Sequence, residues 1–116
     1  MASFTLKTSE QGGVLIVEIQ GYFAGDAGAA LQTLADEQCR AGRLKILLDF
    51  SACNVVSSPG VAALMEITLR ITEDFQGKTA MCGLDTLKRN VFSMAGITSI
   101  APECADRATG VQELQK

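Results

Sequence analysis

The chain of 116 residues contains no histidine and no tryptophan, and aromatic side chains make up only 5% of it. Without histidine, one chain supports neither Ser-His-Asp nor Cys-His nucleophilic catalysis, and histidine-ligated metal sites are excluded on the same ground. The scarcity of aromatic rings argues against base stacking on single-stranded nucleic acid. Since carboxylates are not clustered either, we expect a protein that is not an enzyme and holds no cofactor or metal.

Positive charge is also scarce. Ten lysines and arginines stand against 13 aspartates and glutamates, which gives a net charge of −3, and no basic run is longer than Lys88-Arg89. A protein that binds the nucleic-acid backbone needs a basic surface, so that class of function is not expected. No apolar run approaches the roughly 20 residues of a membrane span, and residues 1–10 lack the apolar core of a signal peptide. We expect a cytoplasmic protein with no membrane or nucleic-acid partner.

The four cysteines do not form a metal or disulfide pattern. None of Cys39, Cys53, Cys82 and Cys104 lies in a C-x-x-C sequence, and three of them fall in apolar or strand-like surroundings. Free cysteine behaves as a small hydrophobic side chain. We therefore expect reduced thiols in the core, and neither a disulfide framework nor a zinc site.

Length and composition predict a single globular domain, residues 1–116. Hydrophobic residues make up 47% and charged residues 20%, and a chain of this size buries one core without disulfides or metals. The first two apolar runs, 3–8 and 14–19, flank a glycine-containing turn at 10–13. They predict an antiparallel hairpin whose first strand lies at a sheet edge. A short connector, 21–25, is expected to follow.

Beyond the hairpin, helical and strand patterns alternate. Helices are predicted at 27–40, 58–75, 87–95 and 106–114, and short strands at 45–50, 78–83 and 98–101. The expected helix caps are Asp26, Asp106 and either Asp85 or Thr86. The run 45–50 is almost wholly apolar, which is typical of a central strand covered on both faces. The alternation predicts an α/β fold: a mostly parallel central sheet opened by a β-hairpin, with about four helices.

The chain is organised around the junction 49–61, where the strand 45–50 passes into the longest helix. A helix start offers unpaired backbone N–H groups and partial positive charge, which suit an anion or a partner's carboxylate. Ser57 or Ser58 is expected to cap this helix, since serine is a favoured N-cap and Pro59 a favoured following residue. The same hydroxyls suit a phosphoacceptor, because a phosphoserine would place about two negative charges at the helix start. Spacing leaves both roles open.

Two further charged positions each have two interpretations. Asp49, at the end of its strand, either binds a metal or hydrogen-bonds to the loop after the strand, and its isolation favours the hydrogen bond. Lys88-Arg89 forms either a small anion site or a solvated helix face, and the solvated face is favoured. The glycines near residue 25 match neither G-x-G-x-x-G nor a P-loop, so a nucleotide cradle lacks its motif.

The residues at the junction resemble the signature of the STAS domain family, the bacterial anti-sigma factor antagonists and their relatives. The resemblance rests on the runs Ile46-Leu47-Leu48-Asp49-Phe50-Ser51 and Val55-Val56-Ser57-Ser58-Pro59-Gly60-Val61-Ala62-Ala63-Leu64. It covers nearly the whole chain and includes the opening hairpin and the late run Ser93-Met94-Ala95-Gly96-Ile97. It implies a small α/β protein that regulates transcription by sequestering a partner.

In the best-known members of this family, the partner is an anti-sigma factor that is also a serine kinase of the histidine-kinase-like ATPase type. The unphosphorylated antagonist binds this kinase and frees the sigma factor. Phosphorylation of a serine at the start of the long helix abolishes binding, and a serine phosphatase restores it. The resemblance therefore implies a bacterial signalling protein whose partners are such a kinase and such a phosphatase.

The position of the phosphoacceptor differs from that in the phosphorylated relatives. They read Asp-Ser-Ser-Gly-Leu, with the modified serine directly before the glycine. The strand aspartate precedes that glycine by eleven positions, as Asp49 precedes Gly60 here. In this register Pro59 stands at the acceptor position, and the chain is closer to relatives that read Ser-Ser-Ala-Gly-Leu. Phosphorylation is therefore either shifted to Ser58 or Ser57, or absent.

The resemblance and the local pattern predict a contact surface at the junction and on the first turns of the following helix. Small side chains there would let a partner approach the helix closely. The alternative function is a STAS module that binds a nucleotide or a lipid, or a subunit of a signalling or transport assembly. The expected partner contacts are Ser57, Ser58, Pro59, Gly60, Ala62, Ala63 and Glu66.

Overall fold

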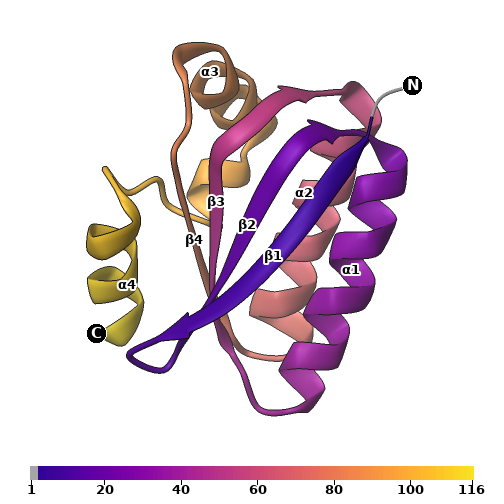
Figure 1. Cartoon of the computed structure of the whole chain (residues 1–116). Helices are drawn as coiled ribbons and strands as arrows, with labels where there is room; N and C mark the ends of the chain where they lie inside the picture. The colour runs from indigo at the N-terminus through magenta and orange to yellow at the C-terminus, as the bar shows by residue number, and fades with distance from the viewer. Residues whose placement is uncertain (1–2) are drawn as a thin grey trace.

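The computed structural model describes residues 3–116 as a mixed α/β fold (Figure 1). The hairpin is followed by helices that alternate with strands. In chain order the elements are β1 (Phe4–Gln11), β2 (Val14–Phe23), α1 (Gly25–Arg40), β3 (Lys45–Val56), α2 (Ser58–Leu69), the π-helical turn η1 (Arg70–Asp74), β4 (Lys78–Cys82), α3 (Thr86–Ala95), the 3-10 turn η2 (Ile97–Ser99) and α4 (Arg107–Gln115).

The sheet has the strand order β1-β2-β3-β4, with β1 at one edge, as predicted. β1 runs antiparallel to β2, whereas β2 and β3, and then β3 and β4, are parallel. Gly12 and Gly13 form the hairpin turn with φ angles of 58° and 81°, which glycine adopts without a steric penalty. A mostly parallel sheet opened by a hairpin confirms the predicted fold class.

Helices cover both faces of the sheet. α1 and α2 lie side by side against one face, and α4 lies against the other (Figure 1). Ile46 and Leu48 of β3 belong to the larger core under α1 and α2, whereas Leu47 belongs to a smaller core with Val111 and Leu114 of α4. The almost wholly apolar sequence of this part of β3 follows from its position, because both of its faces are covered.

A row of three aromatic rings runs through the larger core. Phe23 of β2 and Phe50 of β3 meet edge to face with ring centroids 6.4 Å apart. Phe50 meets Phe92 of α3 in the same way at 5.3 Å. All three side chains are fully buried, so the row links the end of β2 and the middle of β3 to α3.

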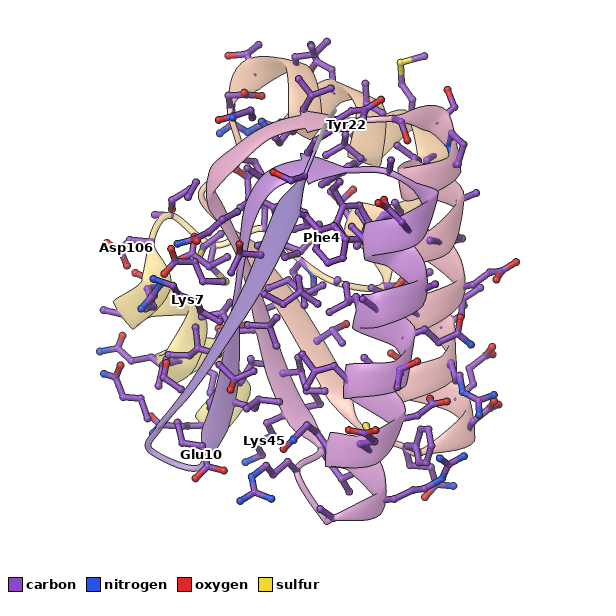
Figure 2. The ribbon with its side chains drawn as sticks, turned by 45° about the vertical axis from the view of Figure 1, so that its right-hand side comes forward. Phe4, Lys7, Glu10, Tyr22, Lys45 and Asp106 are labelled. Atoms are coloured by element: carbon purple, nitrogen blue, oxygen red, sulfur yellow. The ribbon has the colours of Figure 1, made fainter. Side chains whose placement is uncertain are left out.

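The carboxyl ends of β2 and β3 lie together at one end of the sheet. At this end Tyr22 pairs with Val55, and β3 then passes into α2. Figure 2 shows Tyr22 at this end of the molecule and Glu10 and Lys45 at the opposite end. α3 also lies at the Tyr22 end (Figure 1). We call this end the junction end.

All four cysteines, Cys39, Cys53, Cys82 and Cys104, are free and buried, as predicted. Burial raises the pKa of each thiol. The pKa of Cys82 rises to about 12, because the nearby carboxylate of Asp49 adds to the effect of burial. These thiols are therefore protonated groups that pack in the core.

Three strands are longer than the sequence predicts, and the first of them, β1, continues to Gln11, past its predicted end at residue 8. The predicted connector at 21–25 is wrong, because β2 continues to Phe23, and β3 likewise continues past its predicted end to Val56. The extensions of β2 and β3 pair with each other after register shifts in the ladder, and Phe23 lies opposite Val56. Residues 51, 52 and 54 are exposed, so the extension of β3 lacks the apolar pattern that indicates a buried strand.

The predicted last strand at 98–101 is also wrong. Gly96 ends α3 in the left-handed conformation, with φ of 87°, and Ile97–Ser99 forms the turn η2. A left-handed glycine redirects the chain, so the buried Ile97 packs as part of a turn and not of a strand. Beyond the turn, an isolated bridge between Met81 and Glu103 adjoins β4.

Helix boundaries agree with the predicted caps at α3 and α4 but not at α1. Asp85 and Asp106 each accept a hydrogen bond at 2.8 Å from the backbone N–H three residues further on. α1 begins before Asp26, and its N-cap, Ala24, makes no side-chain hydrogen bond. The predicted long helix ends as an α-helix at Leu69 and continues as the π-helical turn η1.

Candidate functional site

The start of α2 is built by the end of β3 and one capping serine. Ser57 has extended backbone angles (φ −82°, ψ 168°), and its Oγ accepts a hydrogen bond from the Gly60 N–H at 3.2 Å. Ser57 is therefore the N-cap, and Ser58 and Pro59 are the first two helical residues. Proline is tolerated there because the first N–H groups of a helix have no intrahelical partner.

Ser58 has a different environment from Ser57. It is exposed, and the structure gives its hydroxyl no hydrogen bond to any part of residues 3–116. Ser57 is half-buried, and its hydroxyl is engaged in the cap. The Ser58 side chain is therefore open to solvent, whereas the Ser57 side chain is part of the cap.

Gly60 determines how closely α2 approaches the end of β2. It is buried, and a Cβ at this position would overlap the carbonyl oxygen of Phe23. The same carbonyl accepts a hydrogen bond from the Ser57 N–H at 3.0 Å. A larger side chain would push α2 away from β2. Gly60 is therefore not itself exposed to a partner, but it determines the position of the α2 residues that are.

The other predicted contact residues differ in exposure. Ala63 is half-buried and faces Gly28 of α1, where a Cβ would overlap the Ala63 methyl group. Four predicted contacts are exposed on the first turns of α2, and they carry a single charge. We call this surface the α2 strip: Ser58, Pro59, Ala62 and Glu66.

Asp49 does not lie at the junction, because β3 continues beyond it. It is only 3% exposed, and both of its carboxylate oxygens are hydrogen-bonded. Oδ1 accepts from the Ser51 N–H at 2.9 Å and from the Ser51 hydroxyl at 2.6 Å. Oδ2 accepts from two guanidinium nitrogens of Arg107, at 2.7 and 3.0 Å. The predicted bond to the following residues is present, although Ser51 belongs to the strand and not to a loop.

Arg107 connects the first turn of α4 to two strands. Besides Asp49 on β3, its guanidinium contacts Glu18 on β2 at 3.1 Å. Burial pushes the pKa of Asp49 upward, but the bonds from Ser51 and Arg107 outweigh it, and the pKa lies below its ordinary value. Bonds from Gln20 and Arg107 lower the pKa of Glu18 as well. The bonds of Arg107 join α4 to β2 and β3. Within residues 3–116 no three potential metal ligands are grouped.

Lys88 contradicts the prediction of a solvated helix face. It is only 6% exposed, and its Nζ donates to Asp85 Oδ2 at 2.8 Å. The buried Phe92 lies one turn further along α3, so both side chains point to the covered side of the helix. Arg89 is more exposed, and it pairs with Glu103 at 2.8 Å.

A groove with mostly apolar walls lies between the end of β3 and α3, at the junction end. Its volume is about 120 Å³. Small-molecule sites typically have volumes of roughly 300 to 1,000 Å³, so this groove accommodates a single side chain more readily than a whole ligand. We call it the β3–α3 groove; it is lined by Asn54, Val55, Val56, Asp85, Leu87, Lys88, Val91 and Phe92.

Comparison with known proteins assigns the family. The sequence matches the STAS domain over residues 5–107, and the chain belongs to the STAS domain family. BtrV of Bordetella bronchiseptica, a candidate anti-sigma factor antagonist, is 26% identical over 95 residues, which cover 82% of this chain and 81% of BtrV. The resemblance that the junction predicts is therefore confirmed.

Solved structures share the fold over nearly the full chain. An anti-sigma factor antagonist from Mycobacterium paratuberculosis has a TM-score of 0.84 at 15% identity, over 98% of this chain and 96% of that one. The phosphorylated form of SpoIIAA, a Bacillus cell fate determinant, has a TM-score of 0.67 at 17% identity, over 90% and 93% of the two chains. Within residues 3–116, no helix has both the length and the apolar character needed to cross a bilayer.

Proposed function

We propose that this chain is an anti-sigma factor antagonist, a binding module without enzymatic activity that regulates transcription by sequestering an anti-sigma factor. The observation that carries the proposal is the α2 strip, an exposed and nearly neutral surface at the position of the family signature. The names of BtrV and of the mycobacterial protein, which share this fold or sequence pattern, support it.

The partner we propose is an anti-sigma factor that is also a serine kinase of the histidine-kinase-like ATPase type, and the complex forms in the bacterial cytoplasm. Pro59 and Ala62 are small and exposed, so the backbone of a partner can approach α2 closely. Glu66 offers one charge at the edge of the α2 strip, where a basic side chain of the partner would fix the register.

Ser58 is the phosphoacceptor that the geometry favours, because it is exposed and its hydroxyl is not used in the cap. A phosphate there would add about two negative charges to a nearly neutral surface, and these charges would have to lose water on binding. Phosphorylation would thus release the partner, and a serine phosphatase would restore binding. In this chain the switch lies one residue before the acceptor position of the phosphorylated relatives.

Titration calorimetry tests the binding step. The probe is the purified histidine-kinase-like ATPase encoded nearest to the gene for this chain. We expect direct binding, and Ser58→Glu should weaken it by about tenfold or more. Ser9→Glu, at an exposed position on β1, is the matched control and should bind within about twofold of wild type. Equal affinities for Ser58→Glu and the wild type would contradict the proposed contact surface.

Intact-mass spectrometry after incubation with the same kinase and ATP tests the switch. We expect a gain of one phosphate that Ser58→Ala abolishes and Ser57→Ala retains. A phosphate that maps to Thr98 or Ser99 would overturn the proposed position of the switch.

The alternative function, a STAS module for a nucleotide or lipid or a subunit of a signalling or transport assembly, is tested in parallel. The β3–α3 groove, with a volume of about 120 Å³, is too small to hold a whole nucleotide or lipid by itself. A large thermal stabilisation by one nucleotide or lipid, with no binding of the kinase, would replace the proposed function with this alternative.

A further inference from the structure

Exposed apolar side chains gather at the junction end. Leu87 is 73% exposed and Met94 is 89% exposed, and the spacing of Leu87, Val91 and Met94 puts all three on one face of α3. Val55, at 52%, borders the same region from β3. Within residues 3–116 these are four of the five large apolar side chains that are exposed; the fifth is Leu44. Such a concentration is typical of an interaction surface.

The buried residue Lys88 lies beside these apolar side chains and lines the β3–α3 groove. Lys88 Nζ carries three N–H donors, and within residues 3–116 it donates to one acceptor, Asp85 Oδ2. Burial of an ammonium group is unfavourable, and an apolar side chain at this position would avoid the penalty. The groove therefore combines apolar walls with a cation that has N–H donors available.

The β3–α3 groove is continuous with the junction. Val55 and Val56 line it, and the next residue along the chain is the cap, Ser57. α2 and α3 are in contact, and α3 and the start of α2 lie at the same end of the molecule (Figure 1). A specific interface covers roughly 800 Å² on each partner, which is more than the four residues of the α2 strip supply. A protein bound to the strip would therefore extend over the groove.

We infer that the β3–α3 groove is a second contact site for the proposed anti-sigma factor, and that it receives an aliphatic side chain and an adjoining carboxylate of that partner. The inference rests on the proposed function and names the chemistry of the segment that binds. The aliphatic side chain fills the groove and covers Leu87 and Val91. The carboxylate accepts a hydrogen bond from Lys88, which is already buried and loses little further hydration on binding.

Three variants on α3 test this inference in the same calorimetric assay with the kinase. Leu87→Asp places a charge on the apolar face, and we expect affinity to fall by about tenfold or more. Lys88→Met keeps the packing and removes the cation, and affinity should fall by about fivefold and lose part of its salt dependence. Ser93→Asp, exposed on another side of the same helix, is the matched control and should stay within about twofold.

The outcomes separate this inference from the proposed function. No binding of the wild type would overturn both. Binding of the wild type that neither Leu87→Asp nor Lys88→Met weakens would overturn the groove alone, while the Ser58→Glu effect still reports on the α2 strip. Analytical ultracentrifugation of the free chain tests the competing occupant. A dimer that Leu87→Asp dissolves would assign the groove to a second copy and overturn the inference. Thermal unfolding of each variant verifies that it is folded.

Discussion

The middle and the end of β3 differ in their chemistry. In the middle, Asp49 is buried, and its oxygens accept bonds from Ser51 and Arg107. At the end, β3 leads into the α2 strip, where the side chains are exposed and the Ser58 hydroxyl makes no hydrogen bond within residues 3–116. The buried carboxylate of Asp49 and its bonds from Arg107 thus hold α4 on the sheet, whereas the proposed contact surface has almost no charge. The buried charges around Asp49 hold the fold together, and the exposed, nearly neutral side chains of the α2 strip form the surface where we propose that a partner binds.

Loss of Arg107 should disrupt the middle of β3 and leave its end intact. Arg107→Met leaves the Asp49 carboxylate buried without its cation, so we expect the free energy of unfolding to fall by about 3 kcal/mol. Urea unfolding followed by circular dichroism measures the change. Arg43→Met removes an exposed ion pair with Glu10 and serves as the control, with an expected loss below about 1 kcal/mol. Equal losses of unfolding free energy in Arg107→Met and Arg43→Met would show that the bonds of Arg107 to Asp49 stabilise the fold no more than an exposed ion pair does.

Acid should weaken the same region. The pKa values of Asp49 and Glu18 are lowered in the folded state, so the stability they contribute is present above their unfolded values of roughly 4 and is lost as the pH falls through the folded values. Arg107→Met removes one cause of both shifts. The wild type should therefore be more stable than Arg107→Met by a smaller margin at pH 3 than at pH 6. The decrease in this margin cannot exceed the stability difference measured at neutral pH. A difference in unfolding free energy that stays constant with pH would show that Arg107 does not lower the pKa values of Asp49 and Glu18.

Gly60→Ala tests whether the start of α2, next to the end of β3, contains a position that the fold depends on. The added Cβ would overlap the Phe23 carbonyl, so we expect a loss of about 2 kcal/mol from overpacking. The same substitution at Gly13, where a Cβ meets open space, is the steric control, although its positive φ adds some strain. Thermal and urea unfolding compare the two. A neutral Gly60→Ala would show that α2 can shift away from β2 without loss.

The two serines at the start of α2 should differ by a small but measurable amount. Ser57→Ala removes the cap on the Gly60 N–H, and we expect a loss of about 1 kcal/mol. Ser58→Ala removes an exposed hydroxyl that makes no bond within residues 3–116, and the loss should stay below about 0.5 kcal/mol. Urea unfolding of the pair gives the comparison. The reverse order would assign the cap to Ser58.

The sequence predicts those parts of the fold whose cause is local. The glycine turn produces the hairpin, the apolar run of β3 requires two covered faces, and Asp85 and Asp106 cap their own helices. The extension of β3 to Val56 depends instead on pairing with the end of β2. The turn η2 depends on the left-handed Gly96, after which the apolar residues no longer continue as a strand.

The candidate site divides in the same way. A serine before Pro59 at a helix start is recognisable from neighbouring residues alone. The pair between Asp49 and Arg107 joins residues 58 positions apart, and no periodicity connects them. Lys88 is buried because α3 turns that side, together with Phe92, toward the core. Sequence patterns do not indicate which side of so short a helix is covered, since charged residues are usually exposed.

The row of three phenylalanine rings has a consequence for the entropy of complex formation. The Phe23 carbonyl accepts a hydrogen bond from the N–H of Ser57, the N-cap of α2. The Phe50 ring packs between the rings of Phe23 and Phe92, and Phe92 belongs to α3. The α2 strip and the β3–α3 groove therefore both pack on the same part of the core, which fixes the distance between them. A partner that contacts both meets a preorganised surface, so association loses little conformational freedom in this chain, and most of the contact energy is retained as affinity.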